Sequence, residues 1–501
     1  MTYPDNVADS DNRIYPSYLK PFLVLSALVT FGLHLAMSLN RYFDHDEFEA
    51  LHSSWLLWIG DRPYVDFIQH HHLLIHYLLT PLFSLFGADN DVIVAARVLN
   101  YVGLLLMGYL TYHLALELGS DKLTGLAAAT FLPLWILYGV KAVELRPDVP
   151  MNVFTLLGLV LVTRHARLRD HYSLPLAGVA FAVALAFLQK AAIPILLVGA
   201  ILLVRLFIKD LKLAGLGAII LAGTLALLPF ALGVYLTSGF ELYWLYNYTY
   251  NNVYYDLRGI ETFKLTSNIR YAVVINTPLA LLLPFAFLKP SRRHFELLFY
   301  AAGVLGFAVL TGRHNMQYYM LAFPVVSVFA ALGLRELFRR RVRFASATAL
   351  LLLVPGVVRP LINYAYAATY SGAPRLAKID YVNQVARPDA RVYDGNILFN
   401  VFRRDVDFLW YMVVPPYKAP ETMAIIADYD YDVYARIEER RPDIIQVYNP
   451  NKDNLAYLDA EQPVIRDNYL PSQAYDGLYL LNDPEVLSRE RDYLGTLSGL
   501  E

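Results

Sequence analysis

Cysteine is absent from the 501 residues of this chain, and charged residues are scarce. Without cysteine there is no disulfide bond, no thiolate nucleophile and no cysteine metal site, and the redox compartment is left undecided. Only 17% of the residues are charged, whereas an average soluble domain carries about 25%. The formal net charge of -2 gives no indication of a nucleic-acid partner.

Signals for cleavage and internal repetition are also missing. The polar residues 1–20 lack a basic stretch followed by a short apolar core, so we expect no cleavable signal peptide. The first apolar run, residues 21–39, is long enough to cross a bilayer and should be retained. We find no internal repeat and no low-complexity segment.

Hydrophobic residues, in contrast, make up 57% of the chain and dominate it as far as about residue 361. A spanning helix needs about 20 apolar residues, and about eleven runs come close to that length. They predict a mainly α, polytopic transmembrane bundle over residues 21–361. The predicted spans are residues 21–39, 92–117, 123–140, 149–164, 174–189, 191–208, 213–236, 271–288, 295–311, 316–337 and 343–361.

One more apolar run, residues 72–87, determines the predicted orientation. At 1.5 Å per residue it covers only about 24 Å, less than the ~30 Å hydrocarbon core. If this run does not cross and the N-terminus is cytoplasmic, all the basic joints fall inside, as the positive-inside rule favours. These joints are residues 164–169, 205–212, 289–293 and 335–343. We therefore predict a juxtamembrane or re-entrant helix at 72–87 and a cytoplasmic segment at 1–20.

The same orientation places the long first loop, residues 40–91, and the C-terminal region, residues 362–501, outside the cytoplasm. Apolar residues recur at helical spacing over 46–59, which predicts an interfacial amphipathic helix with its polar side in water. Residues 362–501 have the composition of a soluble protein and predict a small α/β domain. We expect strands at 391–394, 407–414, 443–448 and 477–481, and helices at 425–440 and 484–501.

Acidic residues after the first span are the first candidates for chemistry. Asp44, Asp46 and Glu47 open the predicted interfacial helix. They either cap the helix and complement its dipole, or provide a general base or metal ligand at the membrane surface. Asp46 and Glu47 point in different directions on a helix, so they do not form one carboxylate dyad.

Further ionisable residues cluster at the predicted outer ends of the spans. Residues 70–72 are three histidines, which either begin the juxtamembrane helix or contact an anion or an acceptor sugar. Arg146 and Asp148 occupy a proline-rich turn and either cap helix ends or belong to a site. Lys190 either extends to the interface or acts as a functional cation. With Arg313 and Tyr319, Lys190 would form a group that binds an anionic headgroup.

The order and placement of these residues resemble the polytopic C-type (GT-C fold) glycosyltransferases. The resemblance covers about residues 20–320 and is strongest to the branch of protein O-mannosyltransferases and lipid A aminoarabinose transferases. It rests on Asp46-Glu47, residues 60–67 (GDRPYVDF), His71, the run 73–87 ending in LFG, residues 95–97 (AAR), Arg146-Pro147-Asp148 and Gln189-Lys190. The family often has Lys-Pro-Pro or His-Pro-Pro where this chain has His71-His72-Leu73.

The resemblance implies an inverting glycosyltransferase of the cell (inner or plasma) membrane. Such an enzyme moves a sugar from a polyprenyl-phosphate donor to a hydroxyl of a glycan, lipid or protein at the outer face. The implied roles are Asp46 as catalytic base; Glu47 and Asp148 as supporting acids or metal ligands; Lys190, Arg313, Tyr319 and His71 at the donor phosphate; and Asp66 and Arg146 at the acceptor or sugar. A divalent metal is compatible with these residues but is not demanded by their spacing.

Two other classes of protein compete with this interpretation. A transporter or flippase of a lipid-linked sugar would typically show repeats and polar residues at the middle of broken helices. Here the ionisable residues cluster at helix ends instead. A receptor or scaffold acting through its C-terminal region would have no evident use for an acidic first loop.

Overall fold

The computed structural model describes residues 14–253, 277–310, 315–340, 369–395, 399–410, 432–447 and 458–498, together with a few isolated positions between 266 and 365. The chain divides into two compact units. Unit 1 comprises Met1–Arg41, Arg97–Ala231 and Ile260–Thr369. Unit 2 comprises Tyr42–Ala96, Leu232–Gly259 and Tyr370–Glu501. Each unit is described by itself.

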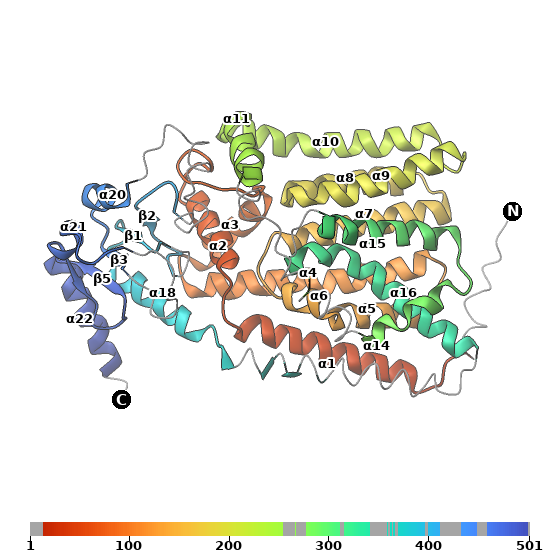
Figure 1. The fold of residues 1–501 in the computed structure, drawn as a ribbon, viewed down its shortest axis with the longest axis horizontal. Coiled ribbons are helices and arrows are strands. Elements are labelled where there is room, and N and C mark those ends of the chain that lie inside the picture. Colours follow the sequence, from red (N-terminus) through yellow and green to blue (C-terminus); the bar gives the residue numbers. More distant parts are fainter. Residues whose placement is uncertain are drawn as a thin grey trace. The chain divides into compact units, whose positions relative to one another are not determined.

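Long apolar helices form unit 1 (Figure 1). Among the described residues, 7 helices are long and apolar enough to cross a membrane. The chain is therefore a multi-pass membrane protein, as predicted. These helices are α1 (Leu19–Asn40), α4 (Asn90–Glu117), α7 (Asp148–Leu168), η4 with α9 (Gln189–Phe207), α10 (Leu213–Thr237), α15 (Arg292–Leu310) and η8 with α16 (Met316–Arg339).

Other predicted spans are shorter or interrupted. Residues 123–140 form α5 (Lys122–Phe131), η3 (Leu132–Leu134) and α6 (Ile136–Lys141), because Pro133 lacks a donor and Trp135 is extended. Residues 174–189 form α8 (Ser173–Phe187), which ends at the extended Leu188. The described part of 271–288 contains only α14 (Thr277–Ala280) and η7 (Leu283–Phe287). Nearly all of 343–361 lies outside the described residues.

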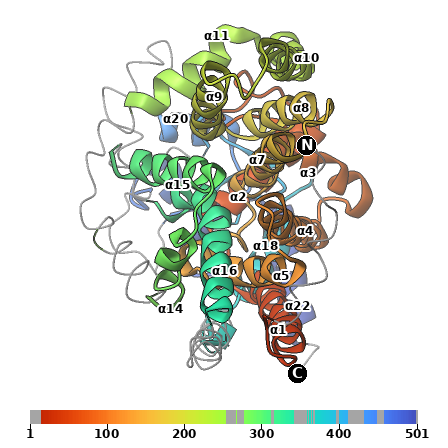
Figure 2. The same cartoon turned by 90° about the vertical axis from the view of Figure 1, so that its right-hand side faces the viewer.

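Glycines allow helices of unit 1 to pack closely. A Cβ added to Gly178 of α8 would lie 2.1 Å from the carbonyl oxygen of Ile219 in α10. A Cβ added to Gly333 of α16 would lie 2.0 Å from the carbonyl oxygen of Leu282. α5 packs against both α1 and α16, as Figure 2 shows from the side. The helix backbones therefore approach at positions that tolerate no side chain.

A five-stranded sheet forms the C-terminal part of unit 2, confirming the predicted α/β domain. Its strands are β1 (Arg391–Tyr393), β2 (Arg404–Asp405), β3 (Ile444–Gln446), β4 (Tyr469–Pro471) and β5 (Leu478–Leu481), in the order β2-β1-β3-β5-β4. β1 is parallel to β2 and β3, whereas β5 is antiparallel to β3 and β4. The accompanying helices are α18 (Ala373–Val385), α20 (Val433–Arg440), α21 (Pro463–Arg466) and α22 (Pro484–Ser498).

The expected strands at 391–394, 443–448 and 477–481 correspond to β1, β3 and β5, but the one at 407–414 is wrong where the structure describes it. Residues 407–410 form a bend and turn directly after β2. Asp407 explains the turn, because its Oδ1 accepts a hydrogen bond from the Leu409 N–H at 3.1 Å. The expected helix at 425–440 is described only from Val433, and the one at 484–501 ends at Ser498 in its described part.

Two helices from the first loop, α2 (His45–Trp58) and α3 (Leu74–Phe86), pack on each other in unit 2. α3 has 13 residues, or about 20 Å, and is too short to span, as predicted. α2 corrects the expectation of a water-facing polar side, because Glu49, Ser53 and Ser54 are buried. Two short helical segments, α11 (Gly239–Trp244) and η5 (Leu245–Tyr250), also belong to unit 2.

Candidate active site

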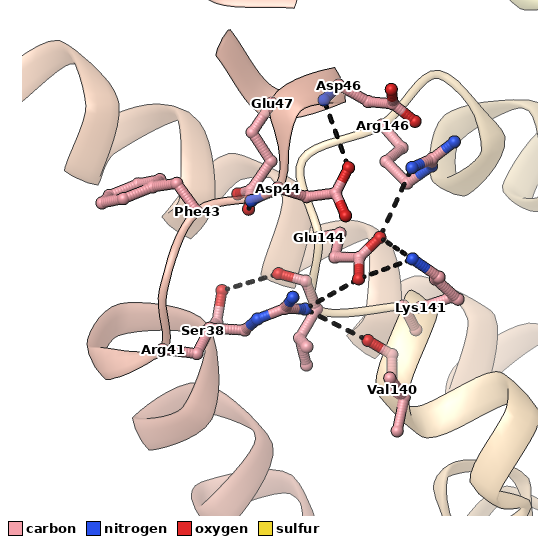
Figure 3. A network of polar contacts seen from close by, with 12 residues as sticks. Ser38, Arg41, Phe43, Asp44, Asp46, Glu47, Val140, Lys141, Glu144 and Arg146 are labelled. Atoms are coloured by element: carbon pink, nitrogen blue, oxygen red, sulfur yellow. Dashed lines mark hydrogen bonds and ion pairs between the residues drawn. The ribbon is translucent and has the colours of Figure 1, made fainter. Parts of the chain in front are cut away.

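The start of α2 has a fixed position because both a capping box and a hydrophobic staple hold it. Asp44 is the N-cap, and the Asp44 N–H donates to Glu47 Oε1 at 2.9 Å in a capping box (Figure 3). Phe43 and Phe48 form the accompanying hydrophobic staple, with ring centroids 5.2 Å apart. The guanidinium of Arg375 on α18 donates to the Phe43 carbonyl at 2.7 Å.

This arrangement separates the roles of the three predicted acids. Asp44 and Glu47 hold the helix start, and Glu47 is fully buried. Asp46 follows the N-cap by two positions; its N–H donates to Asp44 Oδ1 at 3.2 Å, and its carboxylate is not part of the capping box. Asp46 is half-buried, and its role as the catalytic base stays a prediction.

Glu144 of unit 1 is the centre of a buried ion-pair network (Figure 3). Arg41 Nη1 donates to Glu144 Oε1 at 3.0 Å, and Lys141 Nζ donates to its two oxygens at 2.9 and 2.7 Å. Arg146 Nη1 donates to Oε2 at 3.5 Å. Three cations from two chain segments therefore surround one carboxylate.

Asp148 extends the network at the start of α7. Arg146 Nε donates to Asp148 Oδ2 at 3.4 Å, and Lys190 Nζ donates to Oδ1 at 3.1 Å. The Lys190 ammonium also lies 4.2 Å from the centroid of the Tyr318 ring. Four cationic and two anionic side chains of unit 1 therefore meet in one network. Arginine and lysine side chains grouped in this way are the usual ligands of carboxylate and phosphate groups.

Backbone contacts hold the network in place. Arg97, which is buried, donates from Nη1 to the Arg41 carbonyl at 3.0 Å. Asn100 Nδ2 donates to the Ala142 carbonyl at 3.1 Å, and Ser38 Oγ to the Val143 carbonyl at 3.3 Å. The predicted Arg146, Asp148 and Lys190 thus come together, joined by Arg41, Lys141 and Glu144, which sequence analysis did not select.

The histidines at 70–72 lie in an irregular segment of unit 2 that bends at His71, here called the histidine turn. They are not the start of a helix, because α3 begins at Leu74. Gln69 Oε1 accepts hydrogen bonds from the N–H groups of His70 and His71 at 2.7 and 3.0 Å. The His70 and His71 ring centroids are 4.0 Å apart. His70 Nδ1 lies 3.7 Å from Glu49 Oε1 of α2.

Glu49, His70 and His71 form a candidate metal centre. One ligand atom of each lies within 4.8 Å of the others. Two imidazoles and a carboxylate are a common donor set for zinc, and tetrahedral bonds of ~2.1 Å separate ligand atoms by about 3.4 Å. The 3.7 Å distance between Glu49 and His70 is close to that value, so the residues fit such an ion. The turn allows two adjacent histidines to face one point, which a helix would not.

His72 points to a different group of side chains in unit 2. Its Nε2 is 2.7 Å from the Tyr243 hydroxyl and 3.2 Å from that of Tyr248. Burial raises the pKa of Tyr243, so its hydroxyl stays protonated and can donate to a neutral imidazole. Asn251 Nδ2 donates to the His70 carbonyl at 2.8 Å. Residues 243–251 therefore fix the histidine turn.

The remaining predicted site residues differ in exposure, and one of them is not described by the structure. Asp66 is half-exposed and pairs with Arg62 at 3.1 Å; this contact lowers the pKa of Asp66. Tyr319 is buried in η8, next to the Tyr318 that contacts Lys190. Arg313 lies outside the described residues.

Unit 1 also contains an apolar cavity of about 370 Å³ between α8, α9 and α10. Its walls include Phe181, Leu185, Leu202, Ile219 and Leu227. All of these wall residues are apolar.

Solved structures share the fold of this chain. ArnT from Cupriavidus metallidurans bound to undecaprenyl phosphate matches with a TM-score of 0.57 and 15% identity, covering 83% of this chain and 89% of that one. An oligosaccharyltransferase from Archaeoglobus fulgidus in complex with Zn and sulfate matches with a TM-score of 0.54 and 15% identity, covering 76% and 61%. The same organism's AglB, in complex with an inhibitory peptide and a dolichol-phosphate, matches with 0.52 and 13%, covering 86% and 69%.

These matches confirm the predicted GT-C fold, since ArnT is a lipid A aminoarabinose transferase and both ArnT and AglB are GT-C fold glycosyltransferases. No protein-family model and no curated protein sequence matches the chain.

Proposed function

We propose that the protein is an inverting glycosyltransferase of the cell (inner or plasma) membrane. It transfers a sugar from a polyprenyl-phosphate donor to a hydroxyl of a glycan, lipid or protein at the outer face. The observation that carries the proposal is the buried network of arginine and lysine side chains around Glu144 and Asp148, in a chain of GT-C fold. A membrane enzyme that releases a lipid phosphate needs such a group of cations.

The donor phosphate is the leaving group in this reaction. The acceptor oxygen bonds to the anomeric carbon while the bond from that carbon to the phosphate oxygen breaks, and the electron pair stays on the phosphate. This departure needs no general acid, but it needs cations to stabilise the charge. We assign this role to Lys190, with Arg313, Tyr319 and His71 as further contacts from the family resemblance. Direct attack inverts the anomeric centre.

Asp46 is the proposed base that takes the proton of the acceptor hydroxyl. Its carboxylate is outside the capping box, whereas Glu47 is occupied in it. Asp66 and Arg146 are the proposed contacts to the acceptor or sugar. Glu47 and Asp148 support the site by holding the α2 start and the cation network.

We place a divalent metal at Glu49, His70 and His71 and the donor's isoprenoid chain in the apolar cavity of unit 1. When bound, the ion would supply positive charge next to His71. One of the similar solved structures is in complex with Zn and another with undecaprenyl phosphate, which supports the two kinds of ligand.

The decisive experiment compares Asp46→Asn with a matched control, Glu485→Gln. Both acids lie in the first turn of a helix, and each N–H donates to an aspartate two residues earlier. Cells producing each variant are analysed by mass spectrometry for lipid-linked sugars and surface glycans. We expect Asp46→Asn to lower transfer by about a hundredfold or more, because the proton acceptor is lost. Glu485→Gln should match the wild type.

Thermal unfolding of both purified variants checks that the fold is intact. If Asp46→Asn transfers sugar at a near-normal rate, the assignment of the base is wrong. If the glycans and lipid-linked sugars do not change even when the whole protein is removed, the glycosyltransferase proposal itself fails.

A further inference from the structure

A pocket of about 420 Å³ lies within unit 2, among the loop after α2, the β1 and β2 strands and α20. Sites for small molecules usually measure about 300–1,000 Å³. Arginine, aspartate and aromatic side chains line the pocket, among them Arg391, Arg404, Arg440, Asp407 and Trp410. The wall of the pocket therefore combines charged and aromatic side chains.

The arginines of this pocket are unequally neutralised. Arg404 donates to both oxygens of Asp61, at 3.0 and 2.7 Å. Arg391 donates to the backbone carbonyl of Asp405 and has no carboxylate partner among the residues that the structure describes. Arg440 pairs with the exposed Glu439 at 3.4 Å.

The nearby carboxylate of Asp405 is already occupied. Its Oδ2 lies 2.7 Å from His52 Nε2, and its Oδ1 accepts from Asn400 Nδ2 at 2.9 Å. Burial and then repulsion by Arg440 and Arg404 lower the pKa of Arg391. An anion bound between Arg391 and Arg440 would relieve this repulsion.

The rest of the wall suits a sugar ring. Asp407 Oδ2 is buried and accepts no hydrogen bond from the described residues, and the nearest cation, Arg436, is 3.8 Å away. A carboxylate in that state can accept hydrogen bonds from ligand hydroxyls. Phe67, Phe408 and Trp410 add aromatic surface, which packs against the C–H faces of a pyranose.

We propose that this pocket binds a saccharide unit that carries a carboxylate or phosphate group. The anionic group lies at Arg391 and Arg440, the hydroxyls bond to Asp407, and the ring lies against Trp410. The site goes beyond the proposed transfer reaction and does not depend on it, although Asp66 is also part of its wall.

The test is calorimetric titration of the full-length protein in detergent with four probes: glucuronic acid, glucose 6-phosphate, glucose and inorganic phosphate. We expect the two anionic sugars to bind at least about tenfold more tightly than either glucose or phosphate. Arg391→Gln should weaken their binding by about ten- to a hundredfold, because a charge-assisted contact is lost. The matched control is Arg466→Gln, since Arg466 is an exposed arginine of unit 2 that pairs with Asp467 and is not part of the pocket.

Several outcomes would overturn the proposal. If glucose binds as tightly as the anionic sugars, the pocket does not recognise the anionic group. If phosphate binds as tightly as they do, the pocket does not recognise the sugar ring. If Arg391→Gln binds both sugars as tightly as the wild type, the binding site lies elsewhere. If Arg391→Gln does not fold, the more exposed Arg440→Gln replaces it and unchanged binding has the same meaning. Asp46→Asn should retain binding, so failure of the transferase proposal and failure of this one are distinguishable.

Discussion

The ammonium group of Lys190 lies between the Asp148 carboxylate, at 3.1 Å, and the Tyr318 ring, at 4.2 Å. A lysine that extends to the membrane interface would place its ammonium group in water. With a side chain only 17% exposed, Lys190 instead joins a buried network. This geometry argues against simple extension to the interface, and the functional role of Lys190 stays a prediction.

We expect Lys190→Met to weaken binding of undecaprenyl phosphate by about ten- to a hundredfold, because one charge-assisted contact is lost while most of the side-chain volume remains. Binding is measured by titration of the purified protein, and Lys212→Met, at an exposed lysine before α10, is the control. The double variant Lys190→Met with Asp148→Asn separates two explanations. If neutralising Asp148 restores binding, Lys190 only balances that carboxylate.

The sequence indicates which ionisable residues belong to the network better than it indicates their ion-pair partners. Arg146, Asp148 and Lys190 were identified from their places at helix ends, and they do come together. Arg41 was missed because its contact with Glu144 joins positions 103 residues apart. Arg41 directly after the first apolar run was the available signal, but a single sequence does not show such long-range pairing.

At the scale of elements, α2 shows why the amphipathic pattern wrongly predicted a polar side in water. The pattern reports that one side is polar but not which groups satisfy it. Ser53 accepts a hydrogen bond from Gln69 at 3.0 Å, and His52 contacts the Val401 carbonyl and Asp405. These partners lie between 16 residues (Gln69 after Ser53) and 353 residues (Asp405 after His52) further along the chain. The polar side of α2 is thus buried against protein.

We expect Glu49 of α2, together with His70 and His71 of the segment that follows it, to bind one zinc ion per chain. We expect His70→Ala and Glu49→Gln to lose it after dialysis, as measured by elemental mass spectrometry. Free zinc at about a hundred times its dissociation constant should stabilise the wild type by about 2.7 kcal/mol, which a thermal shift would detect. His171→Ala removes an exposed histidine and should have no effect. Zinc contents equal in all variants would contradict the assignment.

At the scale of the whole molecule, unit 2 is built from three separate parts of the chain. The change in composition near residue 361 predicted a boundary there, and that boundary stays a prediction. Residues 42–96 and 232–259 join the C-terminal region because they contact it directly, for example through the paired Asp61 and Arg404. A compositional change marks where apolar runs stop, but it does not show which earlier loops pack on the segment that follows.

Ion pairs in unit 1 link the predicted cytoplasmic joints to one another. Arg205 Nε donates to Glu296 Oε1 at 3.0 Å, and Arg292 pairs with Asp210 at 3.3 Å. Arg169 also pairs with Asp210. The ends of α7 and α9 and the start of α15 therefore meet at one end of the helices. Positive charge collected at one end is the pattern expected of a cytoplasmic face.

The orientation is tested by single cysteines, because the chain has none of its own. His45→Cys and Ser371→Cys lie at exposed positions of unit 2 and should react with a membrane-impermeant thiol reagent on intact cells. Lys212→Cys and Ser291→Cys lie at exposed positions of two basic joints and should react only after the membrane is opened. The reason is that α3 is too short to cross, so the basic joints stay inside and unit 2 stays outside. Labelling of Lys212→Cys but not His45→Cys on intact cells would reverse the orientation. The proposed transfer at the outer face would then be wrong, because Asp46 would face the cytoplasm.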